Sequence, residues 1–161
     1  MADHALDDTD HKILEALTDD GRMSIRALAE RLHISRANAY ARVTRLQRTG
    51  VIRGFRAEID PELSGLGTSA YVTMSIRQPA WRQIAAKLQE LPAVAHIALV
   101  GGEFDVILLV RARDNAHLRR LVLDEIQGMD GVVSTRTLLI FEEPTPTSRQ
   151  QERHPLQEDL L

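Results

Sequence analysis

The N-terminal part of the chain is built around the stretch SIRALAERLHISRANAYARVTRLQRTG, residues 24–50. Ser24 and Ser35 each precede a run with apolar residues at helical spacing, which is the position and the residue type of a helix N-cap. Gly50 follows the second run, where the left-handed conformation that ends many helices favours glycine. The stretch therefore predicts two short helices separated by about three residues, the second of them cationic, which is a helix-turn-helix pattern.

The flanking residues extend this pattern into a domain. Upstream, Ile13 and Leu17 belong to an apolar stripe at helical spacing, which predicts a preceding helix. Asp7 and Asp10 lead into that stripe, and negative charge suits a helix N-terminus. Downstream, residues 51–59 alternate in polarity and predict a β-ribbon, the wing of a winged helix-turn-helix.

Arginine is concentrated around the same stretch. Residues 22–56 contain nine arginines and one acidic residue, Glu30, so this segment carries a formal charge of +8. The rest of the chain carries −11, which gives −3 for the whole. Charge separated in this way predicts a polyanion-binding module joined to an acidic body.

Composition excludes several classes of protein. The 161 residues are 43% hydrophobic and 27% charged, which is typical of a globular chain and not of one disordered throughout. The absence of cysteine excludes disulfides, thiolate metal sites and a cysteine nucleophile. No apolar run reaches the roughly 20 residues that cross a bilayer, and the acidic start MADHALDDTD lacks the apolar segment of a secretory signal. We therefore expect a cytoplasmic protein, nucleoid-associated when bound to DNA, with no cofactor, no metal and no membrane partner.

A second pattern begins after the turn-rich residues 60–67. Alternating residues predict strands there, and apolar residues at helical spacing predict helices between them. The expected strands are 70–76, 94–100, 104–110 and 132–141, and the expected helices are 81–91 and one capped by Asp114 or Asn115. This β-α-β-β-α-β order is that of a ferredoxin-like domain, an antiparallel four-stranded sheet with both helices on one face. The predicted fold class is therefore α+β.

The predicted organisation is a winged helix-turn-helix over residues 1–59, a linker over 60–67, a ferredoxin-like domain over 68–143 and a flexible tail over 144–161. The sheet face without helices carries apolar residues that should not remain in water, so we expect a second copy of the chain to cover it. The residues expected on that face are Tyr71, Thr73, Leu99, Ile107, Leu109, Leu139 and their neighbours.

The third helix presents the candidates for DNA contact. Asn38 and Arg42 share one helical face, and asparagine pairs with adenine and arginine with guanine in the major groove, so we predict that these two residues read bases. The other cations more often meet phosphates, which position a protein without specifying sequence. They are Arg36, Arg45 and Arg48 on the helix, with Arg53 and Arg56 of the wing for the flanking backbone or minor groove. Together with the helix caps and a neighbouring tyrosine, the predicted DNA-binding set is Ser24, Ser35, Arg36, Asn38, Tyr40, Arg42, Arg45, Arg48, Arg53 and Arg56.

With these features the chain resembles the Lrp/AsnC, or feast–famine, family of bacterial and archaeal transcription factors. The resemblance rests on LDDTDHKILEALTDDGR at residues 6–22, SIRALAERLHISRANAYARVTRLQRTGVIRGFRAEIDP at 24–61, GGEFDVILLV at 101–110 and VVSTRTLLIFEE at 132–143. It implies a winged helix-turn-helix, a ribbon linker and a C-terminal RAM-type domain that dimerises and senses amino acids. It also implies dimers that assemble into octamers or similar rings on DNA, with an effector shifting assembly or affinity.

The loop GGEFD, residues 101–105, is the candidate effector site. Its glycines let backbone N–H groups approach a carboxylate closely, and Glu103 or Asp105 could accept hydrogen bonds from an α-ammonium group. The resemblance places an amino-acid pocket here, at the dimer interface, with a contribution from the last strand. Phe104 stands where the family often has tyrosine, so a hydroxyl is absent at this position. The predicted effector-binding set is Gly101, Gly102, Glu103, Phe104, Asp105, Thr135, Thr137, Leu138 and Leu139.

These patterns predict a DNA-binding regulator of amino-acid metabolism or transport genes that responds to an amino acid and is not an enzyme. One alternative is a haem-pathway decarboxylase resembling this family, although the six histidines are scattered and no two have metal-ligand spacing. Another is an amino-acid-sensing module without DNA binding, against which the cationic third helix argues. For the loop, the alternative to an effector site is a tight turn with an aspartate that caps it.

Overall fold

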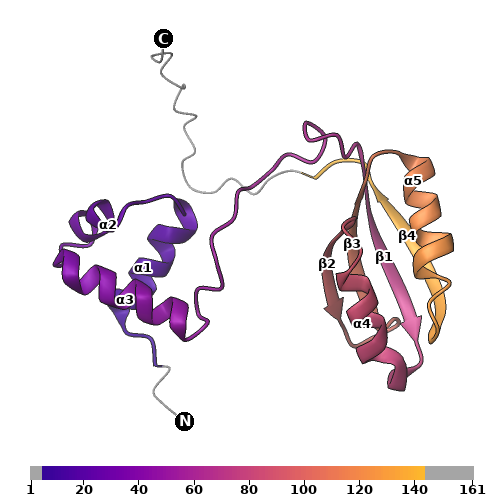
Figure 1. The fold of residues 1–161 in the computed structure, drawn as a ribbon, viewed down its shortest axis with the longest axis horizontal. Coiled ribbons are helices and arrows are strands. Elements are labelled where there is room, and N and C mark those ends of the chain that lie inside the picture. Colours follow the sequence, from indigo (N-terminus) through magenta and orange to yellow (C-terminus); the bar gives the residue numbers. More distant parts are fainter. Residues whose placement is uncertain (1–4, 144–161) are drawn as a thin grey trace. The chain divides into compact units, whose positions relative to one another are not determined.

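The computed structural model describes residues 5–143, which form two compact units that divide between residues 58 and 59 (Figure 1). The first unit contains three helices, α1 (Asp8–Asp19), α2 (Ile25–Arg31) and α3 (Arg36–Arg48). The second unit begins at residue 59 and so includes residues 60–67, for which the sequence predicts a linker. The predicted tail over residues 144–161 lies outside the described part of the chain.

The predicted caps of the helix-turn-helix are present. The Ser24 hydroxyl accepts a hydrogen bond from the backbone N–H of Ala27, and the Ser35 hydroxyl accepts one from that of Asn38. Gly50 has a φ of 76°, the left-handed conformation expected just past the end of α3. Local sequence therefore determines where α2 and α3 begin and where α3 ends.

A small apolar core holds the three helices together. Its buried residues come from α1, α2 and α3, and they are Ile13, Ala16, Leu28, Val43 and Leu46. Ala39 of α3 is also fully buried, so one face of α3, at spacings of four and three residues, packs against the rest of the unit. The opposite face of α3 is left for contacts outside the unit.

The predicted β-ribbon over residues 51–59 is wrong. Among the described residues no strand occurs between α3 and the first strand of the sheet, β1 (Thr68–Ile76). An isolated strand leaves its backbone polar groups unpaired, and no other segment of the described chain pairs with this one. Instead, the ring of Phe55 lies against Gly21, in the turn between α1 and α2.

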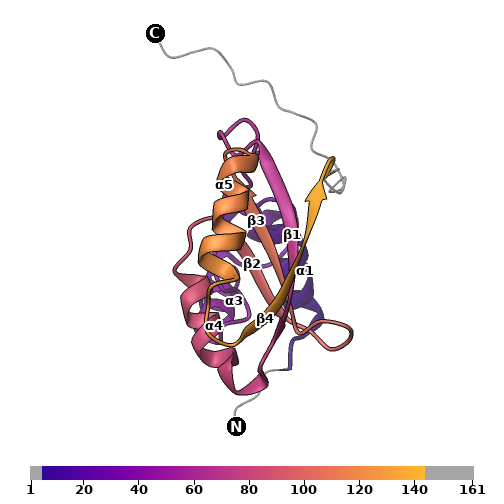
Figure 2. The same cartoon turned by 90° about the vertical axis from the view of Figure 1, so that its right-hand side faces the viewer.

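The second unit is a four-stranded antiparallel sheet covered by helices on one face (Figure 2). Besides β1, its elements are β2 (Val94–Leu99), β3 (Val106–Ala112), β4 (Val132–Ile140), α4 (Trp81–Gln89) and α5 (Asn115–Arg120). The strand order is β2-β3-β1-β4, with helices after β1 and β3, which confirms the predicted ferredoxin-like βαββαβ domain. A 3-10 turn at Gln78–Ala80 precedes α4, and a π-helical segment at Leu121–Ile126 continues α5. Asp114, one of the two predicted caps of this helix, accepts the capping bond from the backbone N–H of His117.

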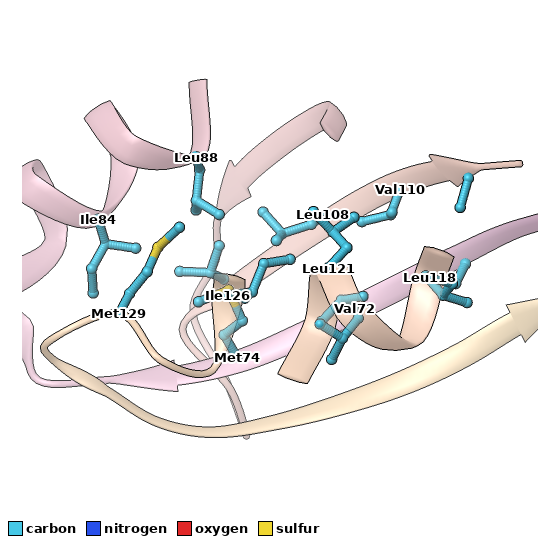
Figure 3. Packing of buried hydrophobic residues seen from close by; sticks show 14 of the residues in the cluster. Val72, Met74, Ile84, Leu88, Leu108, Val110, Leu118, Leu121, Ile126 and Met129 are labelled. Atoms are coloured by element: carbon cyan, nitrogen blue, oxygen red, sulfur yellow. The ribbon is translucent and has the colours of Figure 1, made fainter. Parts of the chain in front are cut away.

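The core of this unit lies between the sheet and its two helices (Figure 3). Alternate residues of β1 and β3, such as Val72 and Leu108, meet Leu88 of α4 and Leu118 of α5 there. Gly131 closes the turn into β4 at a φ of 94°, and a side chain at this position would collide with Ala80. This glycine is therefore required both by its backbone conformation and by close packing.

Strand register corrects two residues predicted for the sheet face that lacks helices. Leu139 pairs with the buried Ala70, and Leu99 pairs with the buried Val106, so both lie on the helix side of the sheet. Leu138 takes the predicted place, because a shift of one residue moves a side chain to the other face. The uncovered face therefore carries Tyr71, Thr73, Ile107, Leu109 and Leu138.

Candidate nucleic-acid interface and effector loop

The outward face of α3 is the candidate nucleic-acid interface. Ala37, Ala41, Thr44 and Arg48 recur at spacings of four, three and four residues, and all are exposed. Tyr40 lies beside this row with 64% of its surface exposed. The helix thus presents a row of mostly short side chains opposite the face that packs in the core.

Two arginines of α3 bind the start of α1 instead of pointing freely into solvent. Nη1 of Arg42 donates to Oδ2 of Asp7 at 2.7 Å and to Oδ1 of Asp10 at 2.8 Å. Nη2 of Arg45 donates to Oδ2 of the same Asp10. Only 1% of the Asp10 side chain is exposed, compared with 24% for Arg42 and 38% for Arg45. Asp10 is therefore the buried centre of an ion-pair cluster that joins α1 to α3.

Asp10 also belongs to the capping box of α1. Its carboxylate accepts from the backbone N–H of Asp7 at 3.1 Å, and its own N–H donates to Oδ1 of Asp7 at 2.8 Å. The two aspartates thus satisfy helix N–H groups and arginine donors together. Charge-assisted bonds of this kind are the stronger class, so the cluster fixes α3 relative to α1.

The cluster shifts the pKa values of its members. Burial alone raises the pKa of Asp10, but hydrogen bonds from Arg45, from the Asp7 backbone and from Arg42 outweigh it and lower that pKa to about 2. The pKa of Asp7 is lowered as well, first by the bond from the Asp10 backbone and then by Arg42. Asp7 and then Asp10 raise the pKa of Arg42. All these charges are present at neutral pH.

The same cluster restrains Asn38. Its side-chain oxygen accepts from Nε of Arg42 at 2.9 Å. A bidentate pair with adenine needs that oxygen as well as the amide nitrogen. The two residues predicted to read bases are therefore bonded to each other, and Arg42 is bonded to α1 as well. Base contact by either residue remains a prediction. The structure shows that both residues also form hydrogen bonds within the first unit.

The other predicted DNA-binding residues are spread along the first unit. Arg36 and Arg48 are exposed near the two ends of α3, and Arg53 and Arg56 are exposed in the irregular segment after it. The hydroxyls of Ser24 and Ser35 accept the helix-capping bonds, as described above. Contact between any of these residues and DNA stays a prediction.

In the second unit, Asp105 holds the candidate effector loop onto the end of β1. Its Oδ2 accepts from the backbone N–H of Ile76 at 2.8 Å, and its Oδ1 accepts from Nε2 of Gln78 at 3.1 Å. The Asp105 backbone N–H donates to the Met74 carbonyl at 2.9 Å. Both carboxylate oxygens thus have partners within the chain, which is the arrangement expected if this aspartate caps a tight turn.

The remaining loop residues are more open. Gly101 and Gly102 have free space where a side chain would begin, and Gly102 has a φ of 143°, which favours glycine. Phe104 is half-buried, whereas Glu103 is exposed and lies 3.7 Å from the guanidinium of Arg136 on β4. The two glycines and the Glu103 side chain are thus the accessible parts of this loop.

The structure brings the loop close to the start of β4 but not to its far end. Thr135 pairs with Met74, the residue to which the loop is hydrogen-bonded. Leu138 and Leu139 pair with Tyr71 and Ala70, at least three positions along the strand and so about 10 Å from Thr135 at the usual strand rise. Within one chain, the predicted effector set therefore divides into a group at the loop and a group near the far end of the edge strand β4.

Sequence reasoning missed the residues that partner the predicted ones. Asp7 and Asp10 were recognised only as helix-starting residues, and nothing in the sequence links Asp10 to arginines 32 and 35 positions later. Gln78 likewise lies 27 positions before the aspartate that it bonds. A paired cluster of this kind has no local sequence signal because the fold alone brings its members together.

In residues 5–143, no cluster of three or more histidine, aspartate or glutamate side chains has the geometry to hold a metal ion. No helix in that part of the chain combines the length and the apolar character needed to cross a bilayer.

The two units define the class of the protein, a transcriptional regulator with a helix-turn-helix for DNA and a separate ligand-binding domain. Residues 6–53 match the winged helix-turn-helix DNA-binding family, and residues 69–150 match the Lrp/AsnC ligand binding domain. The chain belongs to the Lrp/AsnC family of transcriptional regulators, as its sequence motifs predicted.

Several relatives support this assignment. The HTH-type transcriptional regulator AldR of Mycolicibacterium smegmatis is 41% identical over 140 residues, which cover 85% of this chain and 82% of that protein. The proline dehydrogenase transcriptional activator of Rhizobium radiobacter is 32% identical over 145 residues, which cover 86% and 93%. The structure of the transcriptional regulator NMB0573 of Neisseria meningitidis in complex with L-Met matches with a TM-score of 0.81 at 30% identity, over 93% of this chain and 99% of that one. The similar proteins are transcriptional regulators, and this chain is accordingly a regulator and not an enzyme.

Proposed function

We propose that the protein binds specific operator sequences and regulates genes of amino-acid metabolism or transport. This proposal rests on the composition of α3, the second helix of the helix-turn-helix. The helix holds four arginines and no acidic residue. A helix of this kind enters the major groove while its cations neutralise phosphates. The name of the similar proline dehydrogenase transcriptional activator of Rhizobium radiobacter supports a role in amino-acid pathways.

A footprint on the DNA upstream of the protein's own gene tests the operator proposal. We expect a protected region at protein concentrations that leave a scrambled fragment of equal length unprotected. Affinity should also fall steeply between about 50 and 200 mM salt, because phosphate contacts release counterions. Equal retention of both fragments would contradict sequence-specific binding and would favour an amino-acid-sensing module without operator recognition.

We further propose that a free amino acid is the effector and that it binds at the glycine loop, residues 101–105. Open backbone at Gly101 and Gly102 is suited to an α-carboxylate. Since both Asp105 oxygens have partners in the chain, Glu103 is the better candidate for an α-ammonium group. L-Met is the first ligand to test because the similar Neisseria meningitidis regulator is in complex with it.

Calorimetry with the twenty amino acids tests the effector proposal. We expect heat from a small subset, and Gly102→Val should abolish it, because valine both fills the open space and disfavours a positive φ. Gly65→Val is a matched control, since Gly65 also has a positive φ and open space but lies before β1. Absence of heat from every amino acid would contradict the proposal.

The assembly proposed is a homodimer that associates further into an octamer or a similar ring. Apolar side chains on the uncovered sheet face, such as Tyr71 at 41% exposed and Leu138 at 50% exposed, support burial by a second copy. Sedimentation of the full chain tests this, and Leu138→Glu should shift it toward monomer. We place the protein in the cytoplasm, at the nucleoid, because its proposed DNA target lies at the nucleoid.

A further inference from the structure

The arginines that chemistry favours for base reading are withdrawn from the outward face of α3. Arg42 and Arg45 are bonded to Asp10 of α1, and the oxygen of Asn38 is bonded to Arg42. Releasing Arg42 to a base would leave the carboxylate of the buried Asp10 short of a donor, which is costly. If α3 enters the major groove with these ion pairs intact, another part of the helix must therefore meet the base edges.

The row opposite the core is the part that remains. Ala37, Ala41 and Thr44 are exposed, and their side chains end in methyl groups close to the helix axis. Short side chains let the backbone of α3 approach the floor of the major groove more closely than arginines would. Methyl groups cannot bond to guanine, but they make apolar contact with the C5-methyl group of thymine.

We propose that α3 reads thymine methyl groups through Ala37, Ala41 and Thr44, with Asp10 acting as a positioning residue that keeps Arg42 and Arg45 out of the reading face. This inference rests on the proposed operator binding and names what that binding recognises. Exposed cations near both ends of the helix, Arg36 and Arg48, then meet phosphates on the two sides of the groove. Specificity is thereby assigned to thymine positions, and affinity to the arginines.

The test removes single methyl groups from DNA. The full-length protein first selects an operator from a random duplex library, and each thymine of that operator is then replaced by deoxyuridine, one at a time. At one or more positions in each half-site we expect affinity at fixed salt to fall roughly fourfold, the loss expected on uncovering one buried methyl group. Deoxyuridine at the remaining positions should leave affinity unchanged.

Thr44 provides a matched pair of variants for the protein side. Thr44→Ser keeps the hydroxyl and removes the methyl group, so one deoxyuridine position should lose its effect in this variant. Thr44→Val keeps a methyl group and should retain the deoxyuridine effect at that position. A residue with a merely structural role would not change the response to one DNA methyl group. Combining the Thr44 variants with the deoxyuridine substitutions therefore distinguishes a contact with that methyl group from an effect on folding.

Arg42→Ala separates the inference from the alternative in which Arg42 reads guanine. Since Arg42 acts here through the α1–α3 cluster, the variant should bind every operator variant more weakly by the same factor. Two outcomes would overturn this inference and leave the proposed operator binding intact. One is that Arg42→Ala loses its preference at a single guanine; the other is that the selected operator responds to deoxyuridine at no position. A library selection that enriches no sequence would overturn the proposed operator binding as well.

Discussion

Asp10 in the first unit and Asp105 in the second are both aspartates whose two carboxylate oxygens are hydrogen-bonded within the chain, but their partners differ. Asp10 is bonded by the guanidinium groups of Arg42 and Arg45, and it is almost completely buried. Asp105 is bonded by a backbone N–H and a glutamine amide, and it is half-buried. One carboxylate therefore joins two helices through charge, and the other closes a turn through neutral donors.

Each unit uses its hydrogen-bonded aspartate in a different way. Around Asp10, removal of one group leaves an uncompensated charge, and this makes the cluster costly to break. Around Asp105, removal of the carboxylate leaves only neutral donors without partners, which costs less. We expect the first cluster to govern the stability of the DNA-binding unit and the second to govern the shape of the loop.

The largest expected effect is that of Asp10→Ala. The variant should lose about 3 kcal/mol of unfolding free energy in the first unit, the lower end for breaking a buried pair, because both arginines are partly exposed. Helical circular dichroism in urea would report the loss. The chain's single tryptophan, Trp81, lies in α4 of the second unit, and its fluorescence transition should stay in place.

Asp8→Ala is the matched control for that variant. Asp8 is the exposed first residue of the same helix, and its loss should cost less than about 1 kcal/mol through the helix dipole. Equal losses in the two variants would show that helix charge, and not the buried cluster, is what stabilises the unit.

The second effect is a dependence of stability on pH in the acid range. The pKa of Asp10 is about 2 in the folded chain, below the 3.8 of an unperturbed aspartate, so the unfolded chain binds more protons between these values. Stability of the first unit should be complete above about pH 4 and should fall by roughly 2 kcal/mol as the pH drops toward 2. Asp10→Asn should flatten this dependence in acid urea titrations. An unchanged slope in that variant would assign the acid sensitivity to other carboxylates.

Asp105→Ala should have a smaller effect, located in the other unit. Loss of the acceptor leaves the partly buried N–H of Ile76 without a partner, at a cost of roughly 1–2 kcal/mol. The unfolding free energy of the second unit, followed by Trp81 fluorescence, should fall by this amount. Glu103→Ala is the control from the same loop; its exposed pair at 3.7 Å should contribute less than about 0.5 kcal/mol.

The smallest effect is expected at a fully surface-exposed ion pair. Arg26 and Glu30 lie one turn apart on α2, with 79% and 66% of their side chains exposed. Glu30→Gln should therefore change unfolding free energy by no more than about 0.5 kcal/mol. If Glu30→Gln lost as much stability as Asp10→Ala, burial could not explain why the Asp10 cluster contributes more than the other charged groups.

Apart from the ribbon expected over residues 51–59, the helices and strands and their order can be read from local sequence. The caps at Ser24 and Ser35, the end of α3 at Gly50 and the βαββαβ order all follow from residues within a few positions of one another. Local backbone preferences and hydrophobic periodicity depend only on such neighbours, which is why they can be read along the chain. The arginine-rich third helix and the family motifs then identified the class of protein.

Which side chains are free to act depends instead on how the helices and strands pack together. The register of β1 with β4 placed Leu138 and not Leu139 on the uncovered face, and residues 51–59 found no strand to pair with. Packing of α1 against α3 pairs Arg42 with Asp10, although the helical face that it shares with Asn38 had predicted a base-reading role. These outcomes depend on groups about thirty or more positions apart meeting in space, and no local pattern along the chain encodes such a meeting.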